Sequence, residues 1–288
     1  MGRYLNPTND VSFRKLFGTE KHKPLLISFL NSVLSLEGER KIKEVKLLPK
    51  DQAPLIKQTK ASVLDIKCTD ERNIQYIVEM QNKSVPGFVK RTQFYIAHSY
   101  VSQFPEGSDY IELKPVILLA IANYLLFPSK EKVISYHKTL DTHTFEHDLE
   151  DMSYVFIELP KFTKKEDELE TVQDKWLYFF KNWKATKEVP SKIQEKELIE
   201  AYHSMEEYNW NASEREAYIQ ANMALTDEYD ARRKEREEGL KEGLKEGEKK
   251  KSVEIVQKML KITRPIQEIV EVTGLTEEEI QSLQSELS

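Results

Sequence analysis

The chain has 288 residues, which is enough for one sizeable core with an appendage or for two small domains. Charged residues make up 32% and hydrophobic residues 39%, a balance typical of a soluble protein. A single cysteine, Cys68, excludes a disulfide framework and a thiolate metal site, and suits a reducing, cytoplasmic compartment. The N-terminus has no apolar signal core, and the longest apolar run, 115–127, is too short to span a membrane.

Charge is distributed unevenly along the chain. Residues 1–120 carry 18 Lys and Arg against 13 Asp and Glu, although the whole chain has a formal net charge of −6. The remaining residues therefore hold a large excess of acidic groups. A nucleic-acid partner would be attracted to the first part of the chain and repelled by the second.

The first 160 residues predict helices followed by strands that alternate with a further helix. Cap-type residues precede apolar residues at helical spacing near the N-terminus, and period-two alternation marks the strands. In chain order we expect helices over 8–18 and 23–34, a strand over 40–49, a hairpin over 62–83, a helix over 87–104, and strands over 114–127, 132–140 and 152–160. This order indicates an α/β fold with helices packed on a mixed sheet.

From about residue 172 onward the pattern is helical, first over 173–183 and then over 191–209. The composition changes again at 232–251, where glycines recur every four residues among Lys and Glu. This spacing is consistent with a close helix–helix contact or with a solvated, frayed linker, and we favour the linker.

The last segment, 252–287, predicts three short helices, and Thr276 with Glu279 forms a capping box at the start of the third. Two of these helices resemble a helix-turn-helix, but three consecutive Glu residues would repel phosphates, so we favour protein–protein contact. Their hydrophobic faces favour a homodimer. We divide the chain into an α/β domain over 1–185, a helical extension and charged linker over 186–250, and a small helical tail over 251–288.

The predicted hairpin carries polar residues in otherwise apolar strands. Asp65 lies in the first strand, and Glu79 and Gln81 lie at the end of the second. We expect Leu64, Ile66 and Cys68 to share the apolar face of the first strand, because strand side chains alternate. Two registers unite the apolar faces, and they place Glu79 either diagonal to Asp65 or directly opposite it, with Cβ atoms about 4.5–8 Å apart.

Two carboxylates this close beside a core are unfavourable unless a cation lies between them. Their hard oxygen atoms suit Mg²⁺ or Mn²⁺, which take one or two carboxylates and keep several waters. From the spacing alone, an ordinary surface hairpin with solvated charges is the favoured explanation, because unpaired surface charges cost little.

Three segments and the C-terminal pattern resemble a bacterial family, the Rpn recombination-promoting nucleases and transposases of the PD-(D/E)XK nuclease superfamily. The resembling segments are NPTNDVSFRKLFG (6–18), KASVLDIKCTDERNIQYIVEMQ (60–81) and VKRTQFYIAHSYVSQF (89–104), with EGLKEGLKEGEKK and GLTEEEIQSL in the tail. The resemblance covers nearly the whole chain. It implies a restriction-endonuclease-like αβββαβ core, a mixed sheet flanked by helices, followed by a helical C-terminal region.

The resemblance also implies roles for single residues. Asp65 and Glu79 match the two acidic metal ligands, and Asp10 matches an additional acidic position that would hold metal or a metal-bound water. Leu64 replaces the proline of the family motif, a change that affects only the shape of the strand. Gln81 stands where most of the superfamily has lysine, which orients or activates water.

Gln81 can orient a water molecule, but it supplies no positive charge to the transition state. Lys67 and Lys83 share the strand faces of the acidic residues and are candidates for supplying that charge. Lys90 and Arg91, at the start of the following helix, would contact the DNA backbone. A solvated helix end is the alternative explanation for these last two residues.

The resemblance therefore implies a metal-dependent DNA endonuclease, using Mg²⁺ or Mn²⁺ and linked to recombination or transposition. One alternative is a nuclease fold kept as a DNA-binding or interaction module with little catalysis, and another is a defence or toxin-like nuclease. His143 and His147 have the i, i+4 spacing of zinc ligands, but their segment predicts a loop or strand end. No GxxxxGK[ST] loop is present, so ATP-driven transposition is unsupported.

Overall fold

The computed structural model describes residues 3–49, 51–52, 62–103 and 109–286. The chain forms two compact units, Met1–Asn222 and Met223–Ser288. The predicted helical extension from residue 186 begins inside the first unit, because the helix over Lys196–Met205 packs into its core. The predicted domain boundaries at 185 and 250 otherwise stay predictions.

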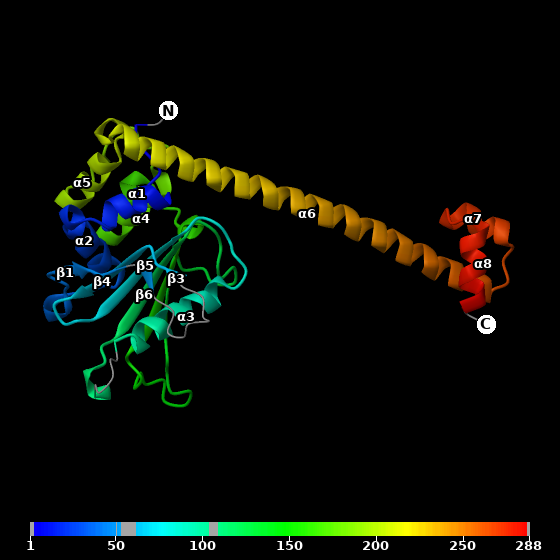
Figure 1. Ribbon diagram of the computed structural model, residues 1–288, viewed down its shortest axis with the longest axis horizontal. Coiled ribbons are helices and arrows are strands. Elements are labelled where there is room, and N and C mark those ends of the chain that lie inside the picture. The colour runs from blue at the N-terminus through cyan, green and yellow to red at the C-terminus, as the bar shows by residue number, and fades with distance from the viewer. Residues whose placement is uncertain (1–2, 50, 53–61, 104–108, 287–288) are drawn as a thin grey trace. The chain divides into compact units, whose positions relative to one another are not determined.

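The first unit is built on a mixed six-stranded sheet with strand order β1-β4-β5-β6-β8-β7 (Figure 1). Its strands are β1 (Val45–Leu47), β4 (Ile66–Asp70), β5 (Gln75–Gln81), β6 (Val116–Ala122), β7 (Ile134–Lys138) and β8 (Met152–Glu158). The strands β1, β4 and β5 form an antiparallel meander, β5, β6 and β8 run parallel, and β7 is an antiparallel edge. A separate two-stranded pair joins β2 (Asp51–Gln52) to β3 (Ser62–Val63).

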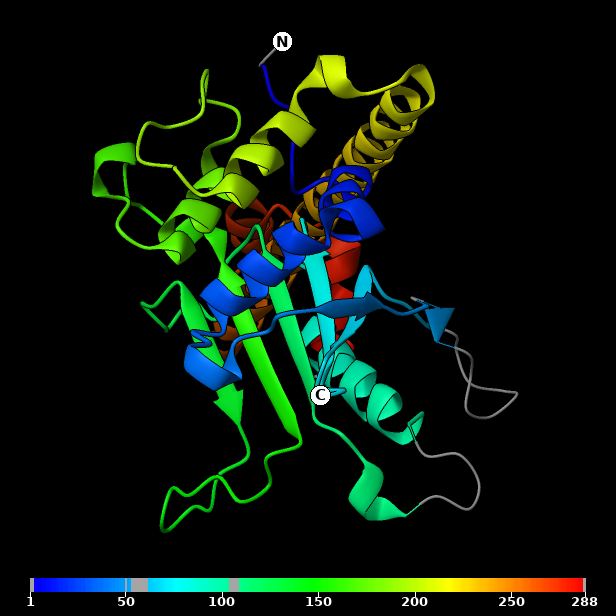
Figure 2. The same ribbon diagram turned by 90° about the vertical axis from the view of Figure 1, so that its left-hand side faces the viewer.

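Helices cover both faces of this sheet (Figure 2). The α-helices of the first unit are α1 (Asp10–Phe17), α2 (Lys23–Val33), α3 (Phe88–Val101), α4 (Val172–Asn182) and α5 (Lys196–Met205). Single 3-10 turns lie at Glu20–His22, Gly38–Arg40, Tyr110–Glu112, Leu159–Lys161, Glu166–Glu168 and Glu207–Asn209. The order α1, meander, α3, β6 confirms the predicted αβββαβ core with flanking helices.

The two faces of the sheet have separate hydrophobic cores. One core joins α1, α2, α4 and α5 to the sheet through an aromatic group, in which the ring of Phe17 lies 5.1 Å from that of Phe29 and 5.7 Å from that of Trp176. The other core lies under α3, where Phe88 and Ile96 pack against the sheet. Burial of each large side chain contributes about 1.5–3 kcal/mol, so both layers hold the sheet firmly.

The first strand of the predicted hairpin is interrupted at its acidic residue. The chain bends at Asp65, between β3 and β4. As a result Leu64 packs on the α3 side, whereas Ile66 and Cys68 pack in the opposite core. The predicted common face of these three residues is therefore wrong for Leu64, because the alternation holds only inside an unbroken strand.

Two other strands are shorter than predicted. The strand expected over 40–49 is limited to β1, because residues 38–40 form a 3-10 turn instead. The strand expected over 114–127 ends at Ala122, because the chain then turns to bring the amides of Leu126 and Phe127 to the carboxylate of Glu158, at 2.6 and 2.9 Å.

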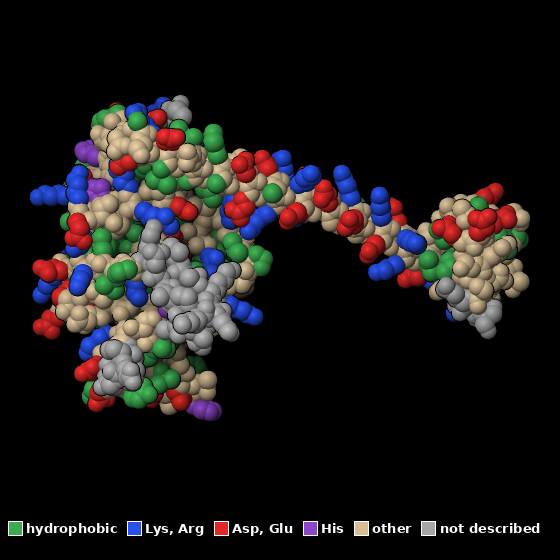
Figure 3. Space-filling model, in the orientation of Figure 1, with side chains coloured by type: hydrophobic (Ala, Val, Ile, Leu, Met, Phe, Trp, Pro, Cys, Tyr) green, Lys and Arg blue, Asp and Glu red, His purple; other side chains and the backbone are tan. Residues whose placement is uncertain are grey.

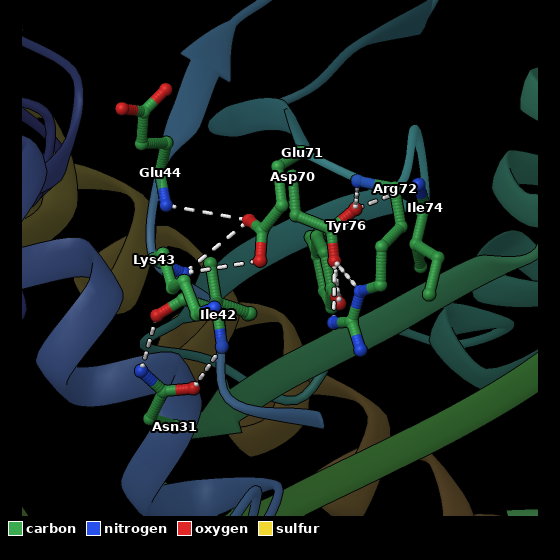
Figure 4. Close-up of polar contacts among 9 residues, drawn as sticks. All are labelled: Asn31, Ile42, Lys43, Glu44, Asp70, Glu71, Arg72, Ile74 and Tyr76. Carbon is green, nitrogen blue, oxygen red and sulfur yellow. Dashed lines mark hydrogen bonds and ion pairs between the residues drawn. The ribbon is translucent and has the colours of Figure 1, made fainter. Parts of the chain in front are cut away.

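A buried carboxylate fixes the turn between β4 and β5 (Figure 4). Asp70 is 5% exposed and accepts hydrogen bonds of 2.6–3.1 Å from the backbone amides of Arg72 and Ile74, the guanidinium of Arg72 and the hydroxyl of Tyr76. The intervening Asn73 adopts a φ of 63°, which asparagine tolerates well. This network sets the register in which Ile66 lies opposite Val78.

The thiol of Cys68 lies in the core beside this turn. Burial, with a smaller effect from the charge of Asp70, raises its pKa to about 12. The thiol therefore stays protonated near neutral pH, as expected of a core cysteine rather than a nucleophile.

The second unit is helical. Its core consists of Val256, Ile269 and Ile280, which come from the end of α6 (Ala212–Lys261), from α7 (Ile266–Thr273) and from α8 (Glu277–Glu286). The predicted capping box is present, because the Thr276 amide donates to Glu279 at 2.9 Å and the Glu279 amide donates to the Thr276 hydroxyl at 3.3 Å.

The charged segment over 232–251 is helical rather than frayed, because α6 continues through it. A Cβ added at any of its three glycines meets no atom within 4 Å, so they make no close helix–helix contact with the described residues. Lys, Arg, Asp and Glu side chains cover the visible surface of α6 (Figure 3). Although α6 has 50 residues, it is too polar to span a bilayer. No other helix among the described residues is both long and apolar enough to do so.

We expect Asp70→Ala to destabilise the first unit by about 2–4 kcal/mol, because it leaves buried donors from three residues without an acceptor. Urea unfolding followed by tryptophan fluorescence measures this loss. The matched control is Glu71→Ala, which removes the neighbouring, solvated carboxylate and should cost less than about 1 kcal/mol. Equal losses in the two variants would contradict the proposed importance of the Asp70 network.

Candidate active site

Two opposed carboxylates lie where β4 begins and β5 ends. The register of β4 with β5 places Ile66 opposite Val78, and the next residues on the two sides are Asp65 and Glu79. The amide of Asp65 donates to Glu79 Oε1 at 3.2 Å, and the amide of Met80 donates to Asp65 Oδ2 at 2.9 Å. Of the two registers that the sequence allowed, the structure thus has the one with direct opposition.

The environment of this pair disfavours two negative charges. Glu79 is 3% exposed, and burial followed by the charge of Asp65 raises its pKa to about 8. The pKa of Asp10, at the start of α1, is also raised, first by loss of solvation and then by Asp65. A cation placed at the carboxylates would therefore be strongly favoured.

Two arginines approach the carboxylates from different helices. Arg14 of α1 places Nη2 3.4 Å from Asp65 Oδ1. Arg91 of α3 donates from Nη2 to Gln81 Oε1 at 3.0 Å. Both guanidinium charges lower the pKa of Glu79, against the larger effects that raise it. The site thus combines acidic residues of the sheet with basic residues of both helical layers.

The other predicted basic residues are placed differently. Lys67 lies opposite Ile77, on the same strand face as Glu79, and burial lowers its pKa. Lys83 lies two residues beyond the end of β5 and is half-buried. Lys90 is exposed on α3, one residue before Arg91. Of these basic side chains, Arg91 is the one that donates to Gln81.

Sequence reasoning missed Arg14 and Tyr124 as members of the site. Arg14 follows Asp10 by four residues, so the two lie on one side of α1, a signal that the sequence contains. Tyr124 follows β6, and the charge of Arg91 lowers its pKa against the larger effect of burial. No sequence pattern marks Tyr124, because its approach depends on how the chain leaves β6.

The loop after β6 is held beside the site. The amide of Asn123 donates to the carbonyl of Gln81 at 2.8 Å, which extends the pairing of β5 with β6 by one residue. The carboxylate of Glu158 binds the two amides described above and the ammonium of Lys161 at 2.5 Å. Glu158 is the last residue of β8, so this buried ion pair holds the loop after β6 at the ends of the parallel strands.

The donor set fits a hard divalent cation that keeps most of its waters. Asp65 and Glu79 each use one oxygen for a backbone amide, and the second oxygen accepts no backbone hydrogen bond from the described residues. Within the described ranges, no three His, Cys, Asp or Glu side chains form a preassembled cluster. Two carboxylates suffice for Mg²⁺ or Mn²⁺, whereas zinc sites usually have three or four protein ligands.

The histidine pair considered from the sequence lies away from this site. His143 is exposed and His147 is half-buried in the loop between β7 and β8. Nδ1 of His147 lies 2.8 Å from the carbonyl oxygen of Thr139. The segment is a loop, as predicted, and no zinc ligand set forms there among the described side chains.

A mixed sheet with an αβββαβ core and opposed acidic residues on neighbouring central strands defines a nuclease-like α/β protein. The family model described as PD-(D/E)XK nuclease family transposase matches residues 7–235. The chain therefore belongs to this family, in agreement with the resemblance seen in its sequence. Neither the curated proteins nor the solved structures contain a match to the chain.

We expect metal-free protein to lose stability as the pH rises from about 5 to 8.5, because the folded state binds the Glu79 proton more tightly than the unfolded state. This contribution is fully present below the unfolded pKa and is lost as the pH passes the folded pKa of about 8. Glu79→Gln has no such proton to bind. Over this pH range the variant should therefore lose on the order of 2 kcal/mol less free energy of unfolding than the wild type. Urea unfolding in EDTA at several pH values measures both proteins, and parallel pH profiles would contradict the expectation.

Proposed function

We propose that the protein is a metal-dependent DNA endonuclease that hydrolyses phosphodiester bonds during recombination or transposition. The observation that carries this proposal is the direct opposition of Asp65 and Glu79 beside Gln81, in a chain of the PD-(D/E)XK nuclease family transposases. The geometry supports a site for a cation and a phosphate, and the family supports DNA as the substrate.

In this proposal Asp65 and Glu79 hold Mg²⁺ or Mn²⁺, and Asp10 contributes from α1, either directly or through water. The bound cation would lower the pKa of a water molecule and neutralise charge on the scissile phosphate. Gln81, at the end of β5, positions the attacking water. The buried position of Glu79 keeps bulk water from screening these charges.

The basic side chains around the site provide contacts to the nucleic acid. Lys67 and Lys83 flank the acidic residues on β4 and beyond β5, and Lys90 is exposed at the start of α3. We assign these three to the DNA backbone, where positive charge gives affinity without sequence preference. The excess of positive charge in residues 1–120 supports the same assignment.

One observation favours a second candidate function, a DNA-binding or interaction module with little catalysis. Gln81 carries no charge, and Arg14 lies 3.4 Å from Asp65, where it compensates that carboxylate. In such a site Asp65 already has a counter-ion and the catalytic lysine is missing. It would bind DNA without cleaving it. Metal-dependent cleavage distinguishes this function from the first.

We expect purified protein to nick supercoiled plasmid in Mg²⁺ or Mn²⁺ and to leave it intact in EDTA. Asp65→Ala and Glu79→Ala should each lower the rate by at least about 10²-fold, because each removes a metal ligand. Gel analysis of nicked and linear products measures the rate. Intact plasmid across both metals, with tight DNA binding in Ca²⁺, would favour the binding module.

We also propose that the second unit mediates homodimer formation in a cytoplasmic protein. Its exposed apolar side chains include Val272, which is 57% exposed on α7. Light scattering after size-exclusion chromatography should give a mass near twice the 33.8 kDa of one chain. Val272→Glu should shift the mass to that of one chain, and a monomeric wild-type protein would contradict this proposal.

A further inference from the structure

Arg91 has a guanidinium group without a carboxylate partner among the residues that the structure describes. Within the described ranges, no Asp or Glu oxygen lies within ion-pair distance of it, although its Nη2 reaches Gln81 Oε1 at 3.0 Å. Its Nε is buried and has no hydrogen-bond acceptor among the described residues. A charged side chain in this state retains donors for another anion.

Aromatic rings hold this guanidinium in place. Its central carbon lies 5.2 Å from the ring centre of Phe88 and 5.8 Å from that of Tyr95. Both rings belong to the core under α3, where Phe88 is 2% and Tyr95 is 6% exposed. These cation–π contacts fix the position of the charge without neutralising it.

Arg91 contacts the strand that carries Glu79. Its Nη2 reaches Gln81, which follows Glu79 by two residues on β5 and therefore shares its strand face. Arg14 already forms an ion pair with Asp65. Of these two guanidinium groups, Arg91 is the one without an ion pair to the described residues.

The contact with Arg91 changes what Gln81 offers to a ligand. Because Gln81 Oε1 accepts from Arg91, the groups that the Gln81 amide still offers as donors are its two N–H groups. The two side chains together form an array of donors with one positive charge. Such an array suits the oxygens of a phosphate better than the hydrogens of a water molecule.

We infer that Arg91, oriented by Gln81, binds the non-bridging oxygens of the scissile phosphate and supplies the positive charge that lysine provides elsewhere in the superfamily. The inference rests on the proposed endonuclease function and makes Arg91 a catalytic residue rather than a peripheral backbone contact. Negative charge grows on these oxygens in the transition state, so a fixed cation there accelerates the reaction.

Arg91 takes part in no proton transfer, because a guanidinium stays charged at all working pH values. In the hydrolysis, the water oxygen forms a bond to phosphorus, and the bond to the leaving oxygen breaks with its electron pair kept by that oxygen. The proton lost by the water balances the proton gained by the leaving oxygen. One water is consumed for each bond cut.

The test measures kcat and KM for a short duplex DNA in Mg²⁺, together with the Kd for the same duplex in Ca²⁺. Arg91→Met keeps the apolar packing against Phe88 and Tyr95 and should lower kcat by about 10²–10³-fold. The Kd should rise far less, because the lost interaction is strongest in the transition state. The matched control is Lys138→Met, an exposed charge removal on β7, which should leave kcat unchanged.

A charge-relocation variant separates a catalytic role from a structural one. Gln81→Lys in the Arg91→Met background places an ammonium at the end of β5 and should recover at least about tenfold in kcat. Arg91→Lys, which retains the charge but loses the fork of donors, should fall between the wild type and Arg91→Met. If circular dichroism shows that Arg91→Met does not fold, Arg91→Lys still tests the inference.

The outcomes distinguish the inference from the proposed function. Loss of cleavage in Asp65→Ala, with full kcat in Arg91→Met, would overturn the inference and leave the endonuclease intact. A low kcat in Arg91→Met that the relocated lysine does not raise would assign Arg91 a structural role and also overturn it. A wild-type protein that neither cleaves nor binds the duplex would refute both.

Discussion

The register between β4 and β5 is the constraint on which the rest of the site depends. Slipping one strand by a single residue would carry every side chain to the other face and separate Asp65 from Glu79. The Asp70 network fixes one end of the hairpin, and the reciprocal amide–carboxylate bonds fix the other. The geometry of the carboxylate pair is thus set by backbone pairing, which the side chains of the turn hold in place.

The same hairpin places an electrostatically unfavourable pair of carboxylates in a well-packed part of the fold. Glu79 is buried between two hydrophobic cores, and its pKa is raised to about 8 by burial and by Asp65. A sequence selected for stability alone would place an apolar residue there, because buried charges rarely repay their desolvation. An unfavourable carboxylate kept inside a well-packed sheet is typical of a site that binds a cation.

Local pattern predicted the elements and the acidic pair, but not the groups that come from a distance. The alternation along β5 identified the face of Glu79, and the order of helices and strands indicated the fold. The bend at Asp65 escaped prediction, because one bend residue reverses the alternation and leaves Leu64 on the α3 side. The contact of Arg91 with Gln81 also escaped, because it depends on how α3 packs against the sheet.

Both helical layers are needed to complete the charge balance of the site. The core of α1, α2, α4 and α5 brings Arg14 to Asp65, and the core under α3 brings Arg91 to Gln81. The two charges are not equivalent, because Arg14 compensates the carboxylate of Asp65, whereas Arg91 has no carboxylate partner among the described residues. A cation at Asp65 and Glu79 would relieve their repulsion without satisfying Arg91. The remaining positive charge therefore faces whatever anion the cation brings, which in a nuclease is the phosphate.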